Sequence, residues 1–137
     1  MSTYAWIITH VNTKELGEDM AEEIGIAGPR DATEEQLLAL KGGAGYTFRM
    51  VDGDGIWCYR GRLVIKDGEA PVARQTTMNP GEKPIWIVSG GLGDEQESFG
   101  PLDDFGRPNC GCTDIQFRCD DPTTIDGGQP AKVWASL

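Results

Sequence analysis

Residues 45–66 read GYTFRMVDGDGIWCYRGRLVIK and show the clearest two-residue periodicity in the chain. In the first part, Tyr46, Phe48 and Met50 share one side of an extended strand, because successive side chains of a strand point to opposite faces. Residues 52–55 are Asp-Gly-Asp-Gly, which tolerate the positive φ angles of a tight turn. The pattern therefore predicts a β-hairpin.

The second arm of this hairpin, residues 56–66, separates large apolar side chains from charged ones. Alternation places Trp57, Tyr59, Leu63 and Ile65 on one side, and Cys58, Arg60 and Arg62 on the other. A glycine inside a strand often marks a bulge, and Gly61 occupies such a position.

Four further segments have the β-branched and aromatic content that is typical of strands. They are residues 4–11, 85–88, 113–119 and 132–135. The connection over residues 89–112 is rich in Gly, Asp and Pro, and it is predicted to be a long surface loop.

Two segments carry helical signals. Residues 13–24 have an apolar side chain at every fourth position and follow Asn12, which can cap a helix. Thr33 and Gln36 have the spacing of a capping box, so a second helix is predicted over residues 33–41.

These elements predict an α+β fold with a mainly antiparallel sheet of five or six strands and one or two short helices. The chain has 137 residues, within the usual size of one domain, so residues 1–137 are expected to form a single domain. The order of the strands and the oligomeric state do not follow from the sequence.

The charge of the chain restricts its partners. Twenty-two acidic residues stand against 12 basic ones, giving a formal net charge of -10. Such a chain is expected to be repelled by nucleic acid and by anionic membranes and to be attracted to basic protein surfaces. The first residues lack the pattern of a signal peptide and no apolar run approaches the length of a membrane span, so a cytoplasmic protein is expected.

The sequence predicts neither a cofactor nor a metal site. Cysteines occur at four positions, which are expected to be reduced thiols: Cys58, Cys110, Cys112 and Cys119. Their spacing departs from the two close pairs of a structural zinc site, although a four-thiolate site stays an alternative. His10 is the only histidine, and no hydroxyl or thiol partner for a catalytic role can be named from the sequence.

Carboxylates are concentrated in two parts of the chain, and a smaller third group near the C-terminus consists of Asp120, Asp121 and Asp126. The first group lies on the predicted N-terminal helix and consists of Glu15, Glu18, Asp19, Glu22 and Glu23. The second lies on the predicted loop and consists of Asp94, Glu95, Glu97, Asp103 and Asp104. If the two groups share a face, they would present rows of negative charge similar to a nucleic-acid backbone.

This distribution favours an acidic interaction module that blocks a basic surface of a partner, such as the surface that a nucleic-acid-binding protein uses. A solvated acidic surface with no partner is the alternative reading of the same residues. Two other functions stay open: a small-ligand binding domain with an apolar pocket beneath the 89–112 loop, and a small enzyme that uses His10.

Several short blocks together resemble a family of small, uncharacterised, acidic bacterial proteins that are often encoded on mobile genetic elements. The blocks are residues 28–32 (GPRDA), 48–50 (FRM) with 52–55 (DGDG), 59–62 (YRGR), and 101–106 (PLDDFG) through Cys112-Thr113. No activity is assigned to that family, so the resemblance implies no site residues. A mobile-element origin would suggest a counter-defence role, such as inhibition of a restriction or CRISPR nuclease.

Overall fold

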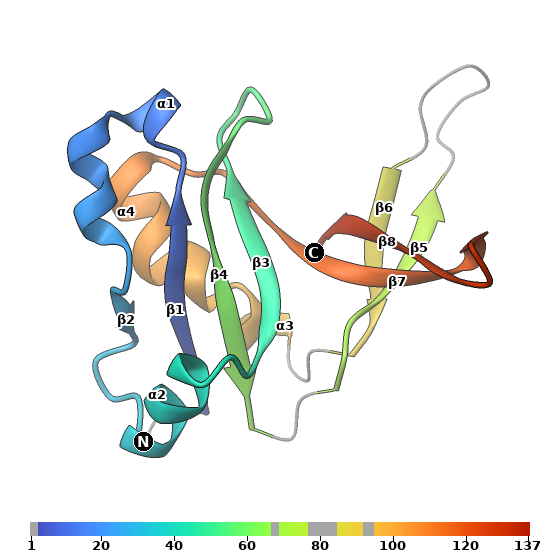
Figure 1. The fold of residues 1–137 in the computed structure, drawn as a ribbon, viewed down its shortest axis with the longest axis horizontal. Helices are drawn as coiled ribbons and strands as arrows, with labels where there is room; N and C mark the ends of the chain where they lie inside the picture. The colour runs from blue at the N-terminus through green and yellow to red at the C-terminus, as the bar shows by residue number, and fades with distance from the viewer. Residues whose placement is uncertain (1–2, 67–68, 77–84, 92–94) are drawn as a thin grey trace.

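A computed structural model describes residues 3–66, 69–76, 85–91 and 95–137, arranged as shown in Figure 1. The strands are β1 (Tyr4–Val11), β2 (Ala27–Gly28), β3 (Tyr46–Val51), β4 (Trp57–Ile65), β5 (Val72–Thr76), β6 (Ile85–Gly90), β7 (Asp114–Asp126) and β8 (Gln129–Ser136). They form one sheet in the order β2-β1-β4-β3-β7-β5-β6-β8, with an additional pairing of β7 and β8.

The predicted α+β class and mainly antiparallel sheet are confirmed, because among the described strands only the β5–β7 and β6–β8 pairings are parallel. The predicted numbers of strands and of helices were both too low, since the described residues contain eight strands and six helical segments. The sequence pattern missed β2 and β5. β2 has only two residues, which are held by their pairing with Trp6 and Ile7, and the exposed Arg74 and Gln75 interrupt the apolar character of β5.

The helical segments are α1 (Thr13–Leu16), η1 (Glu18–Glu23), α2 (Glu34–Lys41), α3 (Glu95–Ser98), η2 (Leu102–Gly106) and α4 (Arg107–Cys110). The capping box before α2 is confirmed: the Gln36 amide donates to Thr33 Oγ1 at 3.1 Å, and the Thr33 amide donates to Gln36 Oε1 at 2.8 Å. The first predicted helix is instead two short pieces, because Gly17 has a φ of 105° that breaks it.

The prediction of a long surface loop over residues 89–112 was wrong for the part that the structure describes. Residues 102–110 form the continuous helical segment η2–α4, and its Leu102 and Phe105 side chains are buried. One glycine just before this segment and one within it allow close packing: a Cβ on Gly100 would lie 2.3 Å from the Tyr4 ring, and one on Gly106 would lie 2.5 Å from Met50 Sδ. The glycine content therefore led to the wrong prediction of a loop where the chain forms a packed helical segment.

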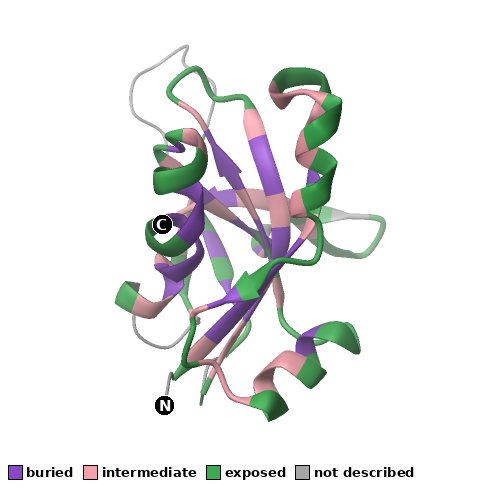
Figure 2. Cartoon of the chain, turned by 90° about the vertical axis from the view of Figure 1, so that its left-hand side faces the viewer, coloured by how far each residue is buried: buried purple, intermediate pink, exposed green. Residues whose placement is uncertain are grey.

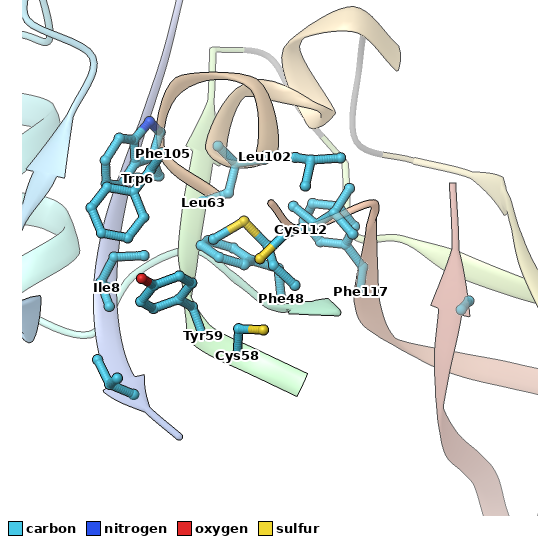
Figure 3. Close-up of a cluster of buried hydrophobic side chains, with 14 of the residues drawn as sticks. Trp6, Ile8, Phe48, Cys58, Tyr59, Leu63, Leu102, Phe105, Cys112 and Phe117 are labelled. Carbon is cyan, nitrogen blue, oxygen red and sulfur yellow. The ribbon is translucent and has the colours of Figure 1, made fainter. Parts of the chain in front are cut away.

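The main core lies between this helical segment and one face of the sheet. The Phe105 ring sits 5.4 Å from the Trp6 ring and 4.9 Å from the Tyr59 ring, measured between centroids. Figure 3 shows these rings with Phe48 and Phe117 of the same cluster, and Figure 2 shows the buried strands between partly exposed helices. Each buried aromatic side chain contributes on the order of 2 kcal/mol of hydrophobic stabilisation.

The opposite face of the sheet is covered at one end only. Leu40 of α2 packs there against Ala5 and Ile7, and of the described helical segments α2 alone contributes to this second, smaller cluster. The Arg62 guanidinium donates a hydrogen bond to the carbonyl of Leu40, near the C-terminus of α2, where positive charge is favourable.

A bulge in the hairpin reverses the faces that alternation predicts for Trp57 and Cys58. Met50 pairs with Tyr59 and Val51 pairs with Trp57, which leaves Cys58 as the extra residue. As a result Cys58 is buried in the core, and Trp57 lies against Arg60 on the other face, the reverse of the prediction from alternation. A second irregularity near Gly61 lies in the partner strand β1, at Thr9.

The long strand β7 connects two parts of the sheet (Figure 1). Its first half pairs with β3, and it pairs with β8 over most of its length. Farther along, Asp120 pairs with Val72 of β5, while Ile87 of β6 pairs with Ser136 of β8. The strands β7, β8, β6 and β5 therefore close into a small four-stranded circuit beside the main sheet.

Gly61 is the tightest point at the centre of this arrangement. A Cβ at this position would lie 2.1 Å from the Ile7 carbonyl oxygen and 2.7 Å from Phe48 Cζ. We expect Gly61→Ala to lower the free energy of unfolding by about 3 kcal/mol, since backbone and core must both shift. The matched control is Gly53→Ala, where a Cβ meets nothing within 4 Å. Urea unfolding of both variants tests this, and coincident curves would contradict the packing described.

Candidate functional site

The first acidic group remains largely exposed. Glu15 lies on α1 and Glu18, Asp19 and Glu22 lie on η1, all exposed to solvent. None of these four forms an ion pair with another described residue. They are available to an external partner.

Three other predicted acidic residues make internal contacts. Glu23 accepts hydrogen bonds from the Tyr59 hydroxyl at 2.9 Å and from the Asn109 amide at 3.0 Å. Asp104 accepts from the Tyr4 hydroxyl at 2.9 Å and from Trp6 Nε1 at 3.0 Å. Asp103 forms an ion pair with Arg107 at 2.8 Å. Glu23 and Asp104 hold the helical layer against the sheet.

The rest of the second acidic group is only partly described. Asp94 and the side chain of Glu95 lie outside the described residues. Glu97 is half-buried and, with Asp103, Asp104 and Tyr4, lines a cavity of about 310 Å³. Its lining is polar and acidic, so it differs from the apolar pocket predicted beneath residues 89–112.

The thiols and the histidine do not form a recognisable reactive centre. Cys58 and Cys112 are buried beside one another, and Cys119 is buried elsewhere in the core. Over residues 3–66, 69–76, 85–91 and 95–137, no cluster of three or more His, Cys, Asp or Glu side chains could hold a metal ion. His10 is exposed, and its Nδ1 lies 2.8 Å from Thr9 Oγ1.

The second face of the sheet carries an arrangement that the sequence reading did not identify. Register places one row of side chains across β1, β4, β3, β7 and β8, namely His10, Arg60, Arg49, Gln116 and Ser136. Two residues farther along β7, Arg118 pairs with Trp134 of β8. All these residues share the face opposite the main core, because side chains of paired residues point to the same side.

Three guanidinium groups converge on one indole ring. The distances from Trp134 to the guanidinium carbons are 4.6 Å for Arg49, 5.5 Å for Arg118 and 5.8 Å for Arg60. Arg60 also lies 4.6 Å from the Trp57 ring. We call the side chains of Arg49, Arg60, Arg118 and Trp134 the arginine face. Such cation–π contacts hold the guanidinium groups in place without neutralising their charge.

Arg49, Arg60 and Arg118 form no ion pair with a carboxylate in the part of the chain that the structure describes. Arg49 Nε donates to Gln116 Oε1 at 2.6 Å, whereas the buried Nε of Arg60 has no described hydrogen-bond partner. Burial lowers the pKa of Arg49, and the charges of Arg60 and Arg118 lower this pKa further. The cluster therefore carries unbalanced positive charge.

Beside the arginine face lies a cavity of about 400 Å³. Its apolar lining comes from Ile85, Trp86, Val133 and Trp134, and its polar lining comes from Arg49, Gln116 and Ser136. Trp86 is fixed by a hydrogen bond from its Nε1 to the buried Asp121 carboxylate at 2.7 Å. An aromatic wall with a few directed polar groups is typical of a small-molecule site.

A sequence signal for this site did exist. Arg49 lies between the core residues Phe48 and Met50, and Arg118 lies between Phe117 and Cys119. Alternation therefore assigns both arginines to the outer side of their strands. Their convergence could not be predicted, because it depends on the adjacency of β3 and β7.

No protein-family model, curated protein or solved structure matches this chain. The resemblance to mobile-element proteins thus stays a prediction. Among the helices that the structure describes, none has the length and apolar character needed to cross a membrane.

The burial of the thiols generates a labelling prediction. Burial raises the pKa of Cys119 to about 12, with a further contribution from Asp120, and burial also raises the pKa of Cys58 and of Cys112. At pH 8 we expect a thiol reagent to modify only the half-buried Cys110 rapidly, and the other three only after unfolding.

The same shifts set the pH dependence of stability. A raised pKa in the folded state favours the neutral thiol, so the free energy of unfolding should decrease as the pH rises above about 8.5, the pKa of an unfolded thiol. Timed labelling followed by mass spectrometry measures how fast each thiol is modified. Cys110→Ser is the control, because it removes the thiol that is expected to react fast. Rapid labelling of any thiol in the folded Cys110→Ser protein would contradict the assignment.

Proposed function

We propose that this protein is a binding module that holds an anionic ligand on the arginine face. The observation that carries this proposal is the convergence of three guanidinium groups on Trp134 without a described carboxylate to pair with them. The chain has a net charge of -10 and acidic residues are abundant, yet no described carboxylate forms an ion pair with this cluster. An external anion would supply the missing charge.

Electrostatics support this reading. Like charges held close together at a partly buried site raise the free energy of the unliganded protein, and perturbed charges of this kind are concentrated at functional sites. Each guanidinium offers several N–H donors in a fixed plane, which suits phosphate and carboxylate oxygens. The contacts with Trp134 orient these donors before a ligand arrives, which reduces the entropy lost on binding.

The proposal also accommodates the negative net charge. Two carboxylates near the arginine face are already engaged: Asp120 pairs with Lys132, and Asp114 accepts a hydrogen bond from Ser136. The exposed carboxylates of η1 lie at the β1 edge of the sheet, where η1 packs against the main core through Met20. Screening at physiological salt limits their influence to about 8 Å.

The test uses inorganic tripolyphosphate as a probe in titration calorimetry. We expect the wild-type protein to bind it, with affinity that falls as salt is added. Arg49→Ala and Arg60→Ala should each weaken binding about tenfold, because a charge-assisted hydrogen bond contributes roughly 1.5 kcal/mol or more.

A matched control is Arg74→Ala on β5, which removes the same charge at an exposed position outside the cluster. It should bind tripolyphosphate as the wild type does. Equal affinities of the wild type and an Arg49→Ala, Arg60→Ala double variant would refute the proposal, provided that circular dichroism shows both proteins to be folded.

A second candidate function is the acidic interaction module that blocks a basic surface of a partner. It is favoured by the four exposed carboxylates of α1 and η1 that form no ion pair with a described residue. Glu23, Asp103 and Asp104 contribute less to such a surface, because internal hydrogen bonds or an ion pair engage them.

Charge reversal tests this second candidate. A variant with Glu15, Glu18, Asp19 and Glu22 replaced by lysine should lose salt-sensitive retention of a basic DNA-binding protein from nuclease-treated bacterial lysate. The control replaces Asp31, Glu34, Glu35 and Glu69, which are also exposed, for the same change of charge. Equal retention by the two variants would show that only net charge matters.

A further inference from the structure

We infer that the anionic ligand of the arginine face is single-stranded nucleic acid, with a base held against Trp134 and the phosphates held by the arginines. This inference rests on the proposed function and adds the class of ligand. Three observations support single-stranded nucleic acid as the ligand: the length of the row of side chains from His10 to Ser136, the lining of the neighbouring cavity, and the separation of the arginines from the exposed carboxylates.

The row from His10 to Ser136 crosses five adjacent strands. Neighbouring strands are about 4.8 Å apart, so the four intervals of the row span roughly 19 Å. A single small anion would contact only part of this row. An extended chain with regularly spaced negative charges could contact Arg60 and Arg49 in succession and continue toward the cavity.

The cavity suits a nucleobase. Trp86 and Trp134 supply aromatic walls. The Gln116 amide bonds to Arg49 and Ser136, and its second N–H and the second lone pair of its oxygen can bond the edge of a base. The cavity volume of about 400 Å³ lies at the lower end of the range for small-molecule sites. Sites for single strands commonly combine basic side chains that follow the backbone with aromatic side chains on which bases stack.

The charge distribution explains how an acidic protein could bind a polyanion. The expectation of repulsion from nucleic acid treated the net charge as if it were uniform. In the structure, the arginines lie on the face of the sheet opposite the main core. The segments α1 and η1, which carry exposed carboxylates, pack against the main core through Leu16 and Met20 at the β1 edge of the sheet. A duplex would bring more charge toward these carboxylates than a single strand lying on the sheet.

The experiment measures the fluorescence anisotropy of a labelled ten-nucleotide single-stranded DNA, with the same sequence as RNA and as a duplex for comparison. An oligo-glutamate of equal charge represents an acidic protein segment. We expect the single strands to bind at least tenfold more tightly than the duplex or oligo-glutamate. RNA and DNA that bind alike would support recognition of the shared bases and phosphates.

Trp134→Leu separates stacking from charge. Loss of one base–aromatic contact should weaken single-strand binding about tenfold. Binding of inorganic tripolyphosphate should weaken by a clearly smaller factor, since the variant loses the ring that orients the guanidinium groups but keeps their charge. Trp134→Phe, which keeps an aromatic ring, should restore most of the single-strand affinity and guards against a variant that merely fails to fold.

The outcomes distinguish the two proposals. If oligo-glutamate binds as tightly as the single strand, or if Trp134→Leu weakens both ligands equally, the nucleic-acid assignment is overturned while the anion-binding function stands. If neither tripolyphosphate nor the oligonucleotide binds to the folded wild-type protein, both proposals are overturned.

Discussion

The packing of Phe105 between Trp6 and Tyr59 determines how the two layers of this protein fit together. It brings the η2–α4 helical segment onto β1 and β4, and the Asp104 carboxylate fixes the position of the segment through its bonds to Tyr4 and Trp6. In the same contact, the backbone at Gly100 and Gly106 closely approaches side chains of the sheet. Without it, the largest apolar face of the sheet would be exposed to water.

This packing also makes the two faces of the sheet different. Because the helical segments other than α2 belong to the layer over the main core or its edge, much of the second face carries polar and amphipathic side chains. Arginine and tryptophan suit that position, since their long or flat apolar parts cover the strands while their polar groups reach the surface. The same property makes the face suitable for binding, because the guanidinium groups are held in place and keep their charge.

Strand β7 has a second organising role. It pairs with β3 in the main sheet and then continues into the circuit with β5, β6 and β8. In this way it brings Arg49 of β3 and Trp134 of β8 to the two sides of its own Gln116 and Arg118. The arginine face is thus a consequence of one strand that belongs to both parts of the fold.

Local features of the fold were determined by the sequence itself. The hairpin around Asp52, the strand over residues 4–11 and the capped helix that begins after Thr33 all follow from interactions between near neighbours, namely alternation, turn residues and side-chain capping. The tertiary structure decided that residues 102–110 are a packed helical segment, that Trp57 turns away from the core, and that Arg49, Arg60 and Arg118 meet. The packing of residues 102–110 and the convergence of the arginines depend on contacts between residues far apart in the chain, and periodicity cannot specify which strands become neighbours. The orientation of Trp57 depends on the bulge at Cys58 within the hairpin, which simple alternation does not anticipate.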